Sequence, residues 1–484
     1  MSLFSRFAKR YEELLVTTKA ALWFTVCNCI SSGISFLSMP FFTRLMSSEQ
    51  YGVVTVYNSW VQVFSVFATL NLSAGAFNNG MVKFSEDRNR FSSAMEGLFS
   101  LVNLVVAVAV ICACSFFPNL VDMPLPFIIT LFFQIFANQI YALWCARQRY
   151  EYKYMALLGM TFVFTVAVTV LSIIAVALVP DDSMKAVSKV MTSAIGGCLV
   201  ATGIVIATQW KSPHPYVGEY WRFAFCFSVP LIPHYLSLII LGQIDRIMIA
   251  SMVGESAAAH YAVAYTIGMA LSIISSALNS SVVPWQFEKI KRGSYEGLAQ
   301  RATAMIAFLS IVGAAVTLIS PEILLIAAPG EYQEAVIVMP PVVMSVVFTF
   351  IYNVLSNYEF YFMANKFISI ASMIAAGVNV ALNIVLIPVF GFSAAAYSTV
   401  LCYGLLALAH TVFSLRVCKM SVGTEAAKKM INAKRIWIIA TAAVIAMLAC
   451  NFLYPHPLAR YLIIAVLCLI AICKKDVVKQ LLSK

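Results

Sequence analysis

Residues Ser237–Tyr265 read SLIILGQIDRIMIASMVGESAAAHYAVAY. An apolar run long enough to cross a lipid bilayer carries the charged pair Asp245–Arg246 within it. The run breaks at Gly254–Ser256, and a second apolar run begins at once. Charged side chains inside a membrane segment are costly and usually face a cavity or a partner. The stretch therefore predicts both a helical membrane protein and a functional site.

The composition of the whole chain supports the same class of protein. Of its 484 residues, 61% are hydrophobic and only 11% are charged, and the mean hydropathy is +0.88. Soluble domains carry about 25% charged residues, so this chain lacks the polar side chains to cover a soluble surface. Its apolar runs are roughly 20 residues long, which favours helices over the alternating ten-residue strands of a barrel. We predict an all-α polytopic membrane protein.

The hydropathy pattern predicts about 14 transmembrane helices, arranged as two six-helix lobes plus a terminal pair. Residues 1–19 form an amphipathic cytoplasmic segment, 20–210 the N-lobe and 211–418 the C-lobe, and 419–484 hold a cytoplasmic linker, the last two spans and a tail. The predicted spans are Ala20–Met46, Gly52–Gly80, Phe91–Phe117, Pro124–Ala146, Tyr154–Val179, Ala186–Gln209, Trp221–Ala250, Ala257–Trp285, Gln300–Ser320, Glu334–Asn357, Phe367–Phe390, Phe392–Arg416, Ile436–Leu453 and Pro457–Cys473.

The basic residues predict the orientation in the membrane. The net charge is +11, and roughly 27 of the 32 Lys and Arg residues fall in alternate loops or in the two tails. This bias is typical of cytoplasmic loops, so we expect both termini in the cytoplasm and the protein in the cell (inner or plasma) membrane. A nucleic-acid partner is excluded, because a basic patch for nucleic acid would gather in one soluble domain.

Cysteine usage and loop length exclude other classes. The twelve cysteines lie mostly inside apolar runs, so we expect buried packing residues and neither disulfides nor a metal site. We expect no cofactor. No predicted outer connection is long enough to fold into a domain, which argues against a glycan polymerase or ligase and against an enzyme in general.

Three basic residues are candidates for binding an anionic group in a cavity. Arg44 begins the sequence Arg-Leu-Met near the outer end of span one, and Arg246 begins the similar Arg-Ile-Met in span seven. Lys83 follows the polar stretch Asn78–Gly80 at the inner end of span two. The alternatives are that Arg44 anchors the helix at the lipid head groups and that Lys83 is an ordinary cytoplasmic loop residue.

Asp245 and Arg246 have different expected roles. Adjacent helical residues point about 100° apart, so one of them can face a cavity while the other pairs with a neighbouring helix. Asp245 is a candidate coupling site for a proton or cation, or the counter-ion of Arg44 or Arg246. Pro230 and Pro233 should bend span seven. Their bend is a candidate hinge, with a static kink as the alternative.

Glu359 lies in an aromatic run near the inner end of span ten. The run is Tyr358–Phe362, with the sequence Tyr-Glu-Phe-Tyr-Phe. Aromatic residues gather where a membrane helix meets the lipid head groups, so an interfacial belt explains this run without any ligand.

Four motifs in the sequence are specific enough to compare with known families. They are Met39–Arg44 with Tyr51–Gly52, Asp245–Arg246 with Gly254 and Tyr261, Gly330–Ala335, and Val378–Asn383 with Ile387–Gly391 and Ala394–Ala396. These motifs resemble the polysaccharide flippase family of the multidrug/oligosaccharidyl-lipid/polysaccharide exporter superfamily. The resemblance covers residues of about 20 to 420, and the span count agrees with the family. In the last motif the family's usual Gly-Ala-Ala reads Ser393-Ala394-Ala395 in this chain.

The resemblance implies a flippase for polyprenyl-diphosphate-linked oligosaccharides. Such a protein moves repeat units from the inner to the outer leaflet by alternating access, for O-antigen, capsule or exopolysaccharide biosynthesis. Its partners would be the lipid-linked glycan, membrane lipids, and a glycan polymerase and glycosyltransferases. A cation-coupled multidrug exporter and a cell-wall lipid-precursor flippase of the same superfamily remain alternatives.

Overall fold

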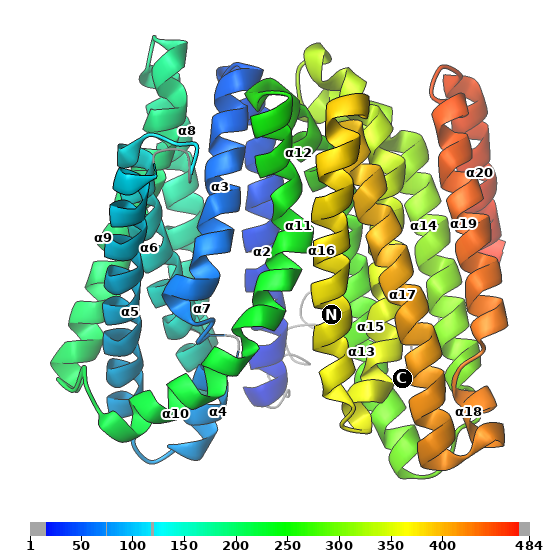
Figure 1. The fold of residues 1–484 in the computed structure, drawn as a ribbon, viewed down its shortest axis with the longest axis horizontal. Coiled ribbons are helices and arrows are strands. Elements are labelled where there is room, and N and C mark those ends of the chain that lie inside the picture. The colour runs from blue at the N-terminus through cyan, green and yellow to red at the C-terminus, as the bar shows by residue number, and fades with distance from the viewer. Residues whose placement is uncertain (1–15, 74, 118–120, 474–484) are drawn as a thin grey trace, which may run out of the picture. The chain divides into compact units, whose positions relative to one another are not determined.

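The structure of the protein is a computed structural model that describes residues 16–73, 75–117 and 121–473 (Figure 1). Every regular element in these ranges is a helix. The amphipathic segment predicted for residues 1–19 lies almost entirely outside the described residues, because the first described helix begins at Val16.

The chain divides into two compact units, Met1–Leu236 (unit 1) and Ser237–Lys484 (unit 2). The division falls inside the predicted span seven, so the residues from 211 to 236 group with unit 1. The predicted lobe boundaries at 210 and 418 stay a prediction. Each unit is described by itself below.

Unit 1 is built on helices that pack around one apolar core. Helix α6 packs against α9, α5 packs against α6, and α3 contacts both α5 and α6. Its elements are α2 (Val16–Leu45), α3 (Ser48–Thr69), α4 (Ala76–Lys83), α5 (Arg88–Phe116), α6 (Leu125–Tyr150), α7 (Tyr154–Thr161), the π-helical turn η1 (Phe162–Ala167), α8 (Val168–Leu178), the 3₁₀ turn η2 (Asp182–Met184), α9 (Lys185–Lys211), α10 (Gly218–Ser228) and the 3₁₀ turn η3 (Val229–Leu231).

Unit 2 has a second apolar core, in which α15 is the most enclosed helix. Helix α15 packs against α17, α14, α13 and α19. The elements of this unit are α11 (Ile232–Met252, whose first five residues belong to unit 1), α12 (Glu255–Met269), α13 (Leu271–Lys291), α14 (Leu298–Ala327), the 3₁₀ helix η4 (Gly330–Val338), α15 (Met339–Tyr361), α16 (Asn365–Phe390), α17 (Ser393–Val422), α18 (Thr424–Met430), α19 (Ala433–Leu453) and α20 (Pro457–Cys473).

The protein is an all-helical, multi-pass membrane protein. Within the described residues, eleven helical segments are long and apolar enough to cross a membrane, and a shorter apolar helix covers Pro457–Leu467. Helices α2 and α3, predicted as spans one and two, are long but fall outside these eleven. The predicted total of about 14 transmembrane helices is therefore not confirmed.

The structure corrects two of the predicted spans. The span expected over Gly52–Gly80 is two helices, because Leu70 and Asn71 both adopt a φ of 49° and end α3 at Thr69. The span expected to end at Ser320 runs on to Ala327, because α14 accommodates Pro321 within its last two turns.

The turn between α16 and α17 follows the sequence motif closely. Gly391 has a φ of 70°, a backbone region that favours glycine, and it joins the two helices within two residues. Ala394, Ala395 and Ala396 are buried where α17 packs on its neighbours, as small residues allow. Pro388 does not end its helix, because α16 continues to Phe390.

Candidate functional site

Asp245 lies at the centre of a buried polar network in unit 2. Its carboxylate accepts a hydrogen bond of 2.6 Å from the Tyr261 hydroxyl, one of 2.7 Å from the Asn383 amide and one of 2.8 Å from the Thr399 hydroxyl. Asp245 is 1% exposed. Because these donors come from α12, α16 and α17, the single carboxylate links α11 to three other helices.

The network continues along α16 and α17. The Asn379 side-chain amide donates to the Thr399 hydroxyl at 3.0 Å, and the Ser398 hydroxyl donates to the side-chain amide oxygen (Oδ1) of Asn383. Asn379 and Asn383 are four residues apart and therefore share one face of α16. The Gly391 turn brings the start of α17 back along that face. Asn379, Asn383 and Tyr261 were predicted only as parts of family motifs, and Ser398 and Thr399 were not predicted at all.

Arg246 points away from its neighbour, as expected for adjacent helical residues. Its guanidinium donates to the Gly242 carbonyl at 3.0 Å and to the Gln243 side chain at 2.8 Å, and it lies 4.4 Å from the centre of the Tyr265 ring. Across the part of the chain that the structure describes, no Lys or Arg nitrogen lies within 4.0 Å of the Asp245 carboxylate. Asp245 is therefore held by neutral donors and not by a direct ion pair.

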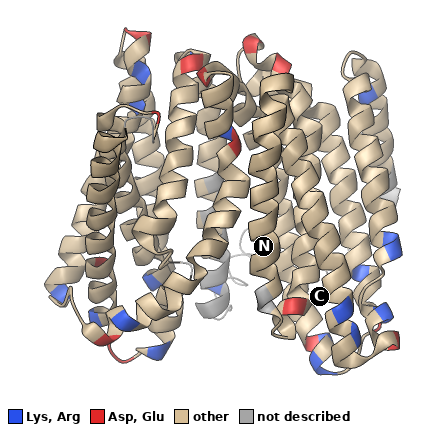
Figure 2. Cartoon of the chain, viewed as in Figure 1, with Lys and Arg blue, Asp and Glu red and all other residues tan. Residues whose placement is uncertain are grey.

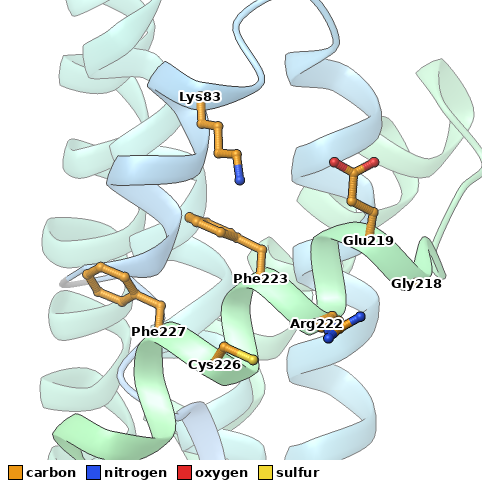
Figure 3. A pocket seen from close by; sticks show the side chains of 7 residues that line it. All are labelled: Lys83, Gly218, Glu219, Arg222, Phe223, Cys226 and Phe227. Carbon is orange, nitrogen blue, oxygen red and sulfur yellow. The ribbon is translucent and has the colours of Figure 1, made fainter.

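Lys83 lines a cavity at one end of unit 1, shown in Figure 3. The cavity has a volume of about 780 Å³. The lysine nitrogen lies 4.9 Å from the centre of the Phe223 ring and 5.2 Å from that of Phe84. The cavity thus combines positive charge with aromatic walls. Its lining residues are Lys83, Gly218, Glu219, Arg222, Phe223, Cys226 and Phe227.

Short contacts fix the position of Lys83. Gly80 brings α4 against the Phe91 ring, since a Cβ atom at Gly80 would lie 2.0 Å from that ring. On the opposite wall, the Tyr220 hydroxyl donates to Asp87 at 3.1 Å, and the Trp221 indole donates to the Ala94 carbonyl at 2.9 Å. These bonds hold α10 against α5 and the turn that precedes it.

The sequence prediction missed Arg222 as a member of this cavity. Arg222 was not among the candidate site residues, but it is exposed on α10 and lines the same cavity as Lys83. The charge pattern placed both residues at the same membrane face. Only the docking of α10 on α4 brings them to one cavity.

Arg44 lies in the last turn of α2 and is exposed. Its guanidinium donates to the Pro40 carbonyl at 3.0 Å. The 22 residues of α3 span about 33 Å between Arg44 and the turn before α4, so Arg44 and Lys83 belong to different ends of unit 1. Arg44 and Lys83 are in unit 1, whereas Asp245 and Arg246 are in unit 2.

Lys189 is a further cation that the sequence analysis counted only as an outer residue. Its nitrogen lies 3.7 Å from the centre of the Phe42 ring and 5.1 Å from that of Tyr51. It sits on the second turn of α9, half-buried between α2 and α3. Phe42 and Tyr51 are far from Lys189 in the sequence, so nothing near Lys189 indicated that it would contact aromatic rings.

The two candidate hinge prolines stand at an interruption of the helix. Pro230 lies in the 3₁₀ turn η3 between α10 and α11, and Pro233 is the second residue of α11. The division between the two units falls three residues later, between Leu236 and Ser237. A 3₁₀ turn interrupts the helix where the sequence predicts a bend, and the hinge role of the two prolines stays a prediction.

Most Lys and Arg residues lie toward one end of each unit, as Figure 2 shows. In unit 2 they lie around the C-terminal end of α17, α18 and the start of α19. Among the described residues, no group of three or more His, Cys, Asp or Glu side chains has the geometry to hold a metal ion.

Comparison with solved structures identifies the fold. The lipid II flippase MurJ in an inward closed conformation aligns with 94% of this chain and 100% of its own at a TM-score of 0.68 and 16% identity. An inward-facing multidrug resistance MATE family transporter of the MOP superfamily aligns with 87% of this chain and 99% of its own at a TM-score of 0.56 and 12% identity. The protein therefore has the fold of MOP superfamily transporters.

Sequence comparison gives a relative and a family. The Lsg locus putative protein 1 of Haemophilus influenzae is 23% identical over 373 residues, which cover 75% of this chain and 89% of that protein. The sequence profile of the polysaccharide biosynthesis protein family matches residues 17–289. Since that match covers more than half of the 484 residues, the chain belongs to the polysaccharide biosynthesis protein family.

Proposed function

We propose that this protein is a flippase that moves polyprenyl-diphosphate-linked oligosaccharide repeat units from the inner to the outer leaflet for polysaccharide biosynthesis. It acts as a transporter and not as an enzyme. The family and the transporter fold support this proposal. The observation that carries it is the cavity of Lys83 and Arg222, because it places two cations, a single carboxylate (Glu219) and two phenylalanine rings around one space.

The chemistry of that cavity suits a phosphorylated sugar. Lysine and arginine are the side chains that bind phosphate, and arginine binds its oxygens in pairs. A volume of about 780 Å³ falls within the range of small-molecule sites in proteins, which is about 300–1,000 Å³. Lys83 and Arg222 therefore bind the diphosphate head group at the cytoplasmic face, before it crosses the membrane.

Arg44 and Arg246 serve the later steps of the same path. Transporters built from two similar halves bind their substrate near the middle of the membrane and expose it to each side in turn. In this proposal Arg44 and Arg246 each contact the diphosphate at a step of its passage through the membrane. Pro230 and Pro233 are the hinge, and Asp245 is the coupling site that binds a proton or a cation.

An apolar groove in unit 2 fits the polyprenyl tail. Its volume is about 510 Å³, and it lies between α15, α17 and α19. Nearly all of its lining side chains are apolar, including Phe348, Trp437 and Met447. The tail rests in this groove while the head group is transported, which gives the terminal helices a role in binding lipid.

We further propose the cell membrane as the location, with both termini in the cytoplasm and with a glycan polymerase and glycosyltransferases as partners. The basic ends of the two units support this orientation. A cysteine-accessibility map tests it directly. A cysteine placed at residue 83 should react only with reagents that reach the cytoplasm, and labelling from outside would contradict the orientation.

Transport itself is tested with purified protein in proteoliposomes that contain a polyprenyl-diphosphate-linked oligosaccharide. Lys83→Ala and Arg222→Ala should each lower the initial rate at least about tenfold, as expected for loss of a charged contact worth about 1.5–3 kcal/mol. Arg292→Ala is the matched control, because that arginine is 72% exposed and pairs with Glu288 on the surface, outside the cavity. Wild-type rates in both cavity variants would remove the cavity from the transport path.

The same assay separates the proposal from its alternatives. A cell-wall precursor flippase would move a lipid-linked muropeptide faster than an oligosaccharide repeat unit. That substrate is included in the assay because the fold is similar to that of MurJ, at a TM-score of 0.68. A multidrug exporter would instead move a lipophilic cation and would transport neither glycolipid.

A further inference from the structure

A carboxylate and an imidazole form an enclosed pair in unit 2, away from the Asp245 network. The His410 Nδ1 atom on α17 lies 2.8 Å from the Glu359 Oε1 atom on α15, and both side chains are 0% exposed. The Ser414 hydroxyl donates to the same Glu359 oxygen at 2.6 Å. On α17, His410 is eleven residues beyond Thr399, which is about 16 Å along the helix.

This position corrects the belt interpretation for two residues of the aromatic run, Tyr358 and Glu359. Tyr358 is 1% exposed and Glu359 is 0% exposed, so neither faces the lipid head groups. Tyr358 instead donates a hydrogen bond to the Met430 carbonyl at 3.1 Å. A residue that only anchored the helix at the interface would not be enclosed in this way.

Among the side chains that the structure describes, the groups around the pair bring no second full charge to it. The His410 ring contacts the rings of Tyr352 on α15 and Phe367 on α16, at centroid distances of 4.7 Å and 5.3 Å. Apart from His410, the titratable groups that face Glu359 are the Tyr352 hydroxyl and the Cys418 thiol. From α19, the Trp437 indole approaches and donates to the Thr411 hydroxyl. In the described ranges no lysine or arginine nitrogen lies within 4.0 Å of this carboxylate.

Two polar atoms of the pair have no hydrogen-bond partner in the described part of the chain. They are the Oε2 atom of Glu359 and the Nε2 atom of His410. With an ionised Glu359 and a neutral His410, the pair carries one buried negative charge and two bare acceptors, which is a costly state. The C-terminal end of α15, two residues away, adds its own partial negative charge.

One added proton removes this charge. The proton comes from water and forms either an O–H bond on Glu359 or a second N–H bond on His410. The net charge of the pair then changes from −1 to 0. The pair also links α15 to α17. The strength of the hydrogen bond between Glu359 and His410 therefore depends on whether the added proton is bound.

We propose that Glu359 and His410 form a proton-binding site that takes up and releases one proton per protein. The site is distinct from Asp245, and the proposal does not depend on which lipid the protein transports. It gives the fold a second titratable centre, placed where α15 and α17 meet.

The test is a pH titration of the full-length protein in nanodiscs, with ¹⁵N-labelled histidine. The chain has only five histidines, so His410→Gln identifies the signals of His410 by their loss. The ring signals of His410 should shift with pH, because the imidazole belongs to the pair that gains or loses the proton. In Glu359→Gln that transition should move by one pH unit or more or disappear.

The matched control is Glu96→Gln. Glu96 is another buried carboxylate, 4% exposed on α5 in unit 1, and one of its oxygens also has no partner among the described residues. The His410 transition should be unchanged in this variant. A transition that is the same in wild type and Glu359→Gln, or no transition at all, would overturn the proposal.

A second measurement covers the case in which Glu359→Gln does not fold. Infrared difference spectra of wild type and His410→Gln report the C=O stretch of protonated carboxyl groups as the pH changes. The band that depends on His410 should belong to one carboxyl group and should persist in Glu96→Gln. If the two spectra are identical, the two residues do not share a proton and the proposal is wrong.

Discussion

The Tyr261 hydroxyl donates a hydrogen bond of 2.6 Å to the Asp245 carboxylate and thereby joins α12 to α11. Both side chains are at most 1% exposed. A hydrogen bond to a charged group contributes about 1.5–3 kcal/mol. Without it, the Oδ2 atom of Asp245 would keep only the bond from Thr399. This contact is therefore a sensitive point of the polar network in unit 2.

Tyr261→Phe should lower the thermal stability of the purified protein. The expected loss in the free energy of unfolding is about 1–2 kcal/mol, because the ring still fills its place and only the hydroxyl is removed. Tyr265→Phe is the matched control on the same helix, since the Tyr265 ring contacts Arg246 through its face. Equal thermal midpoints for the two variants would contradict the importance of the hydroxyl.

Asp245→Asn tests coupling separately from stability. The asparagine side chain has nearly the same shape, but it carries no charge. Its NH₂ group is a donor where the carboxylate had an acceptor, and the Tyr261 and Thr399 hydroxyls around it are donors as well. We expect a folded protein whose transport rate no longer changes with pH or with the external cation. The rate in proteoliposomes across a series of pH values and salts gives the answer. An unchanged dependence would remove Asp245 as the coupling residue.

Periodicity and charge placement predicted the helical membrane fold, because apolar runs of this length have few other solutions. The break at Gly254 and the tight turn at Gly391 also followed from local chemistry, and both glycines have a positive φ. The divergence of Asp245 from Arg246 needed only the geometry of a helix. These features depend on neighbours in the sequence.

The partners of the buried polar groups could not be predicted in the same way. Asn383 lies 138 residues from Asp245, and His410 lies 51 residues from Glu359. The flanking aromatic residues of Glu359 favoured an interfacial belt, since nothing near it in the sequence pointed to His410. The sequence offered one signal for this pair, which is that Glu359 and His410 are each polar residues within an apolar run. Pairing them required the packing of α15 against α17.

Gly80→Ala should weaken the wall of the Lys83 cavity. The added methyl group would lie 2.0 Å from the Phe91 ring, so α4 or the ring must shift at a cost of about 1–3 kcal/mol. Gly159→Ala is the control, because a Cβ atom there meets nothing within 4 Å. Thermal midpoints check the expectation. The smaller side chain of Phe91→Leu should restore part of the loss in the double variant, and an additive loss would contradict the clash.

Arg460→Ala should detach α20 from α14. The guanidinium makes two parallel bonds of 2.7 Å to the Glu322 carboxylate and donates to the Leu318 carbonyl at 2.7 Å. Arg460→Lys keeps the charge but loses the paired geometry, so it should fall between wild type and alanine. Limited proteolysis near residue 455 and the thermal midpoint measure the effect. Wild-type resistance in the alanine variant would show that the pair does not hold the helix.

Glu151→Gln should destabilise the protein in a pH-dependent way. Glu151 follows α6 and accepts 2.7 Å and 2.5 Å hydrogen bonds from Arg147 and Lys153. Burial alone would raise the pKa of this carboxyl, but the bonds from Lys153 and Arg147 outweigh burial and hold the pKa below its usual value. The folded state thus binds the proton less readily than the unfolded chain. The stabilisation is complete above the unfolded pKa of about 4.3 and is lost as the pH falls through the folded value.

The thermal midpoint of Glu151→Gln should therefore lie below that of wild type at pH 7, and the difference should shrink below about pH 4. Glu288→Gln is the matched control, because its pair with Arg292 is exposed on both sides and should contribute little at any pH. The pairing at Glu151 joins the end of α6 to the turn before α7, so its loss acts on that junction. A deficit of the same size at pH 7 and pH 3 would show that the carboxylate acts by shape alone and not by charge.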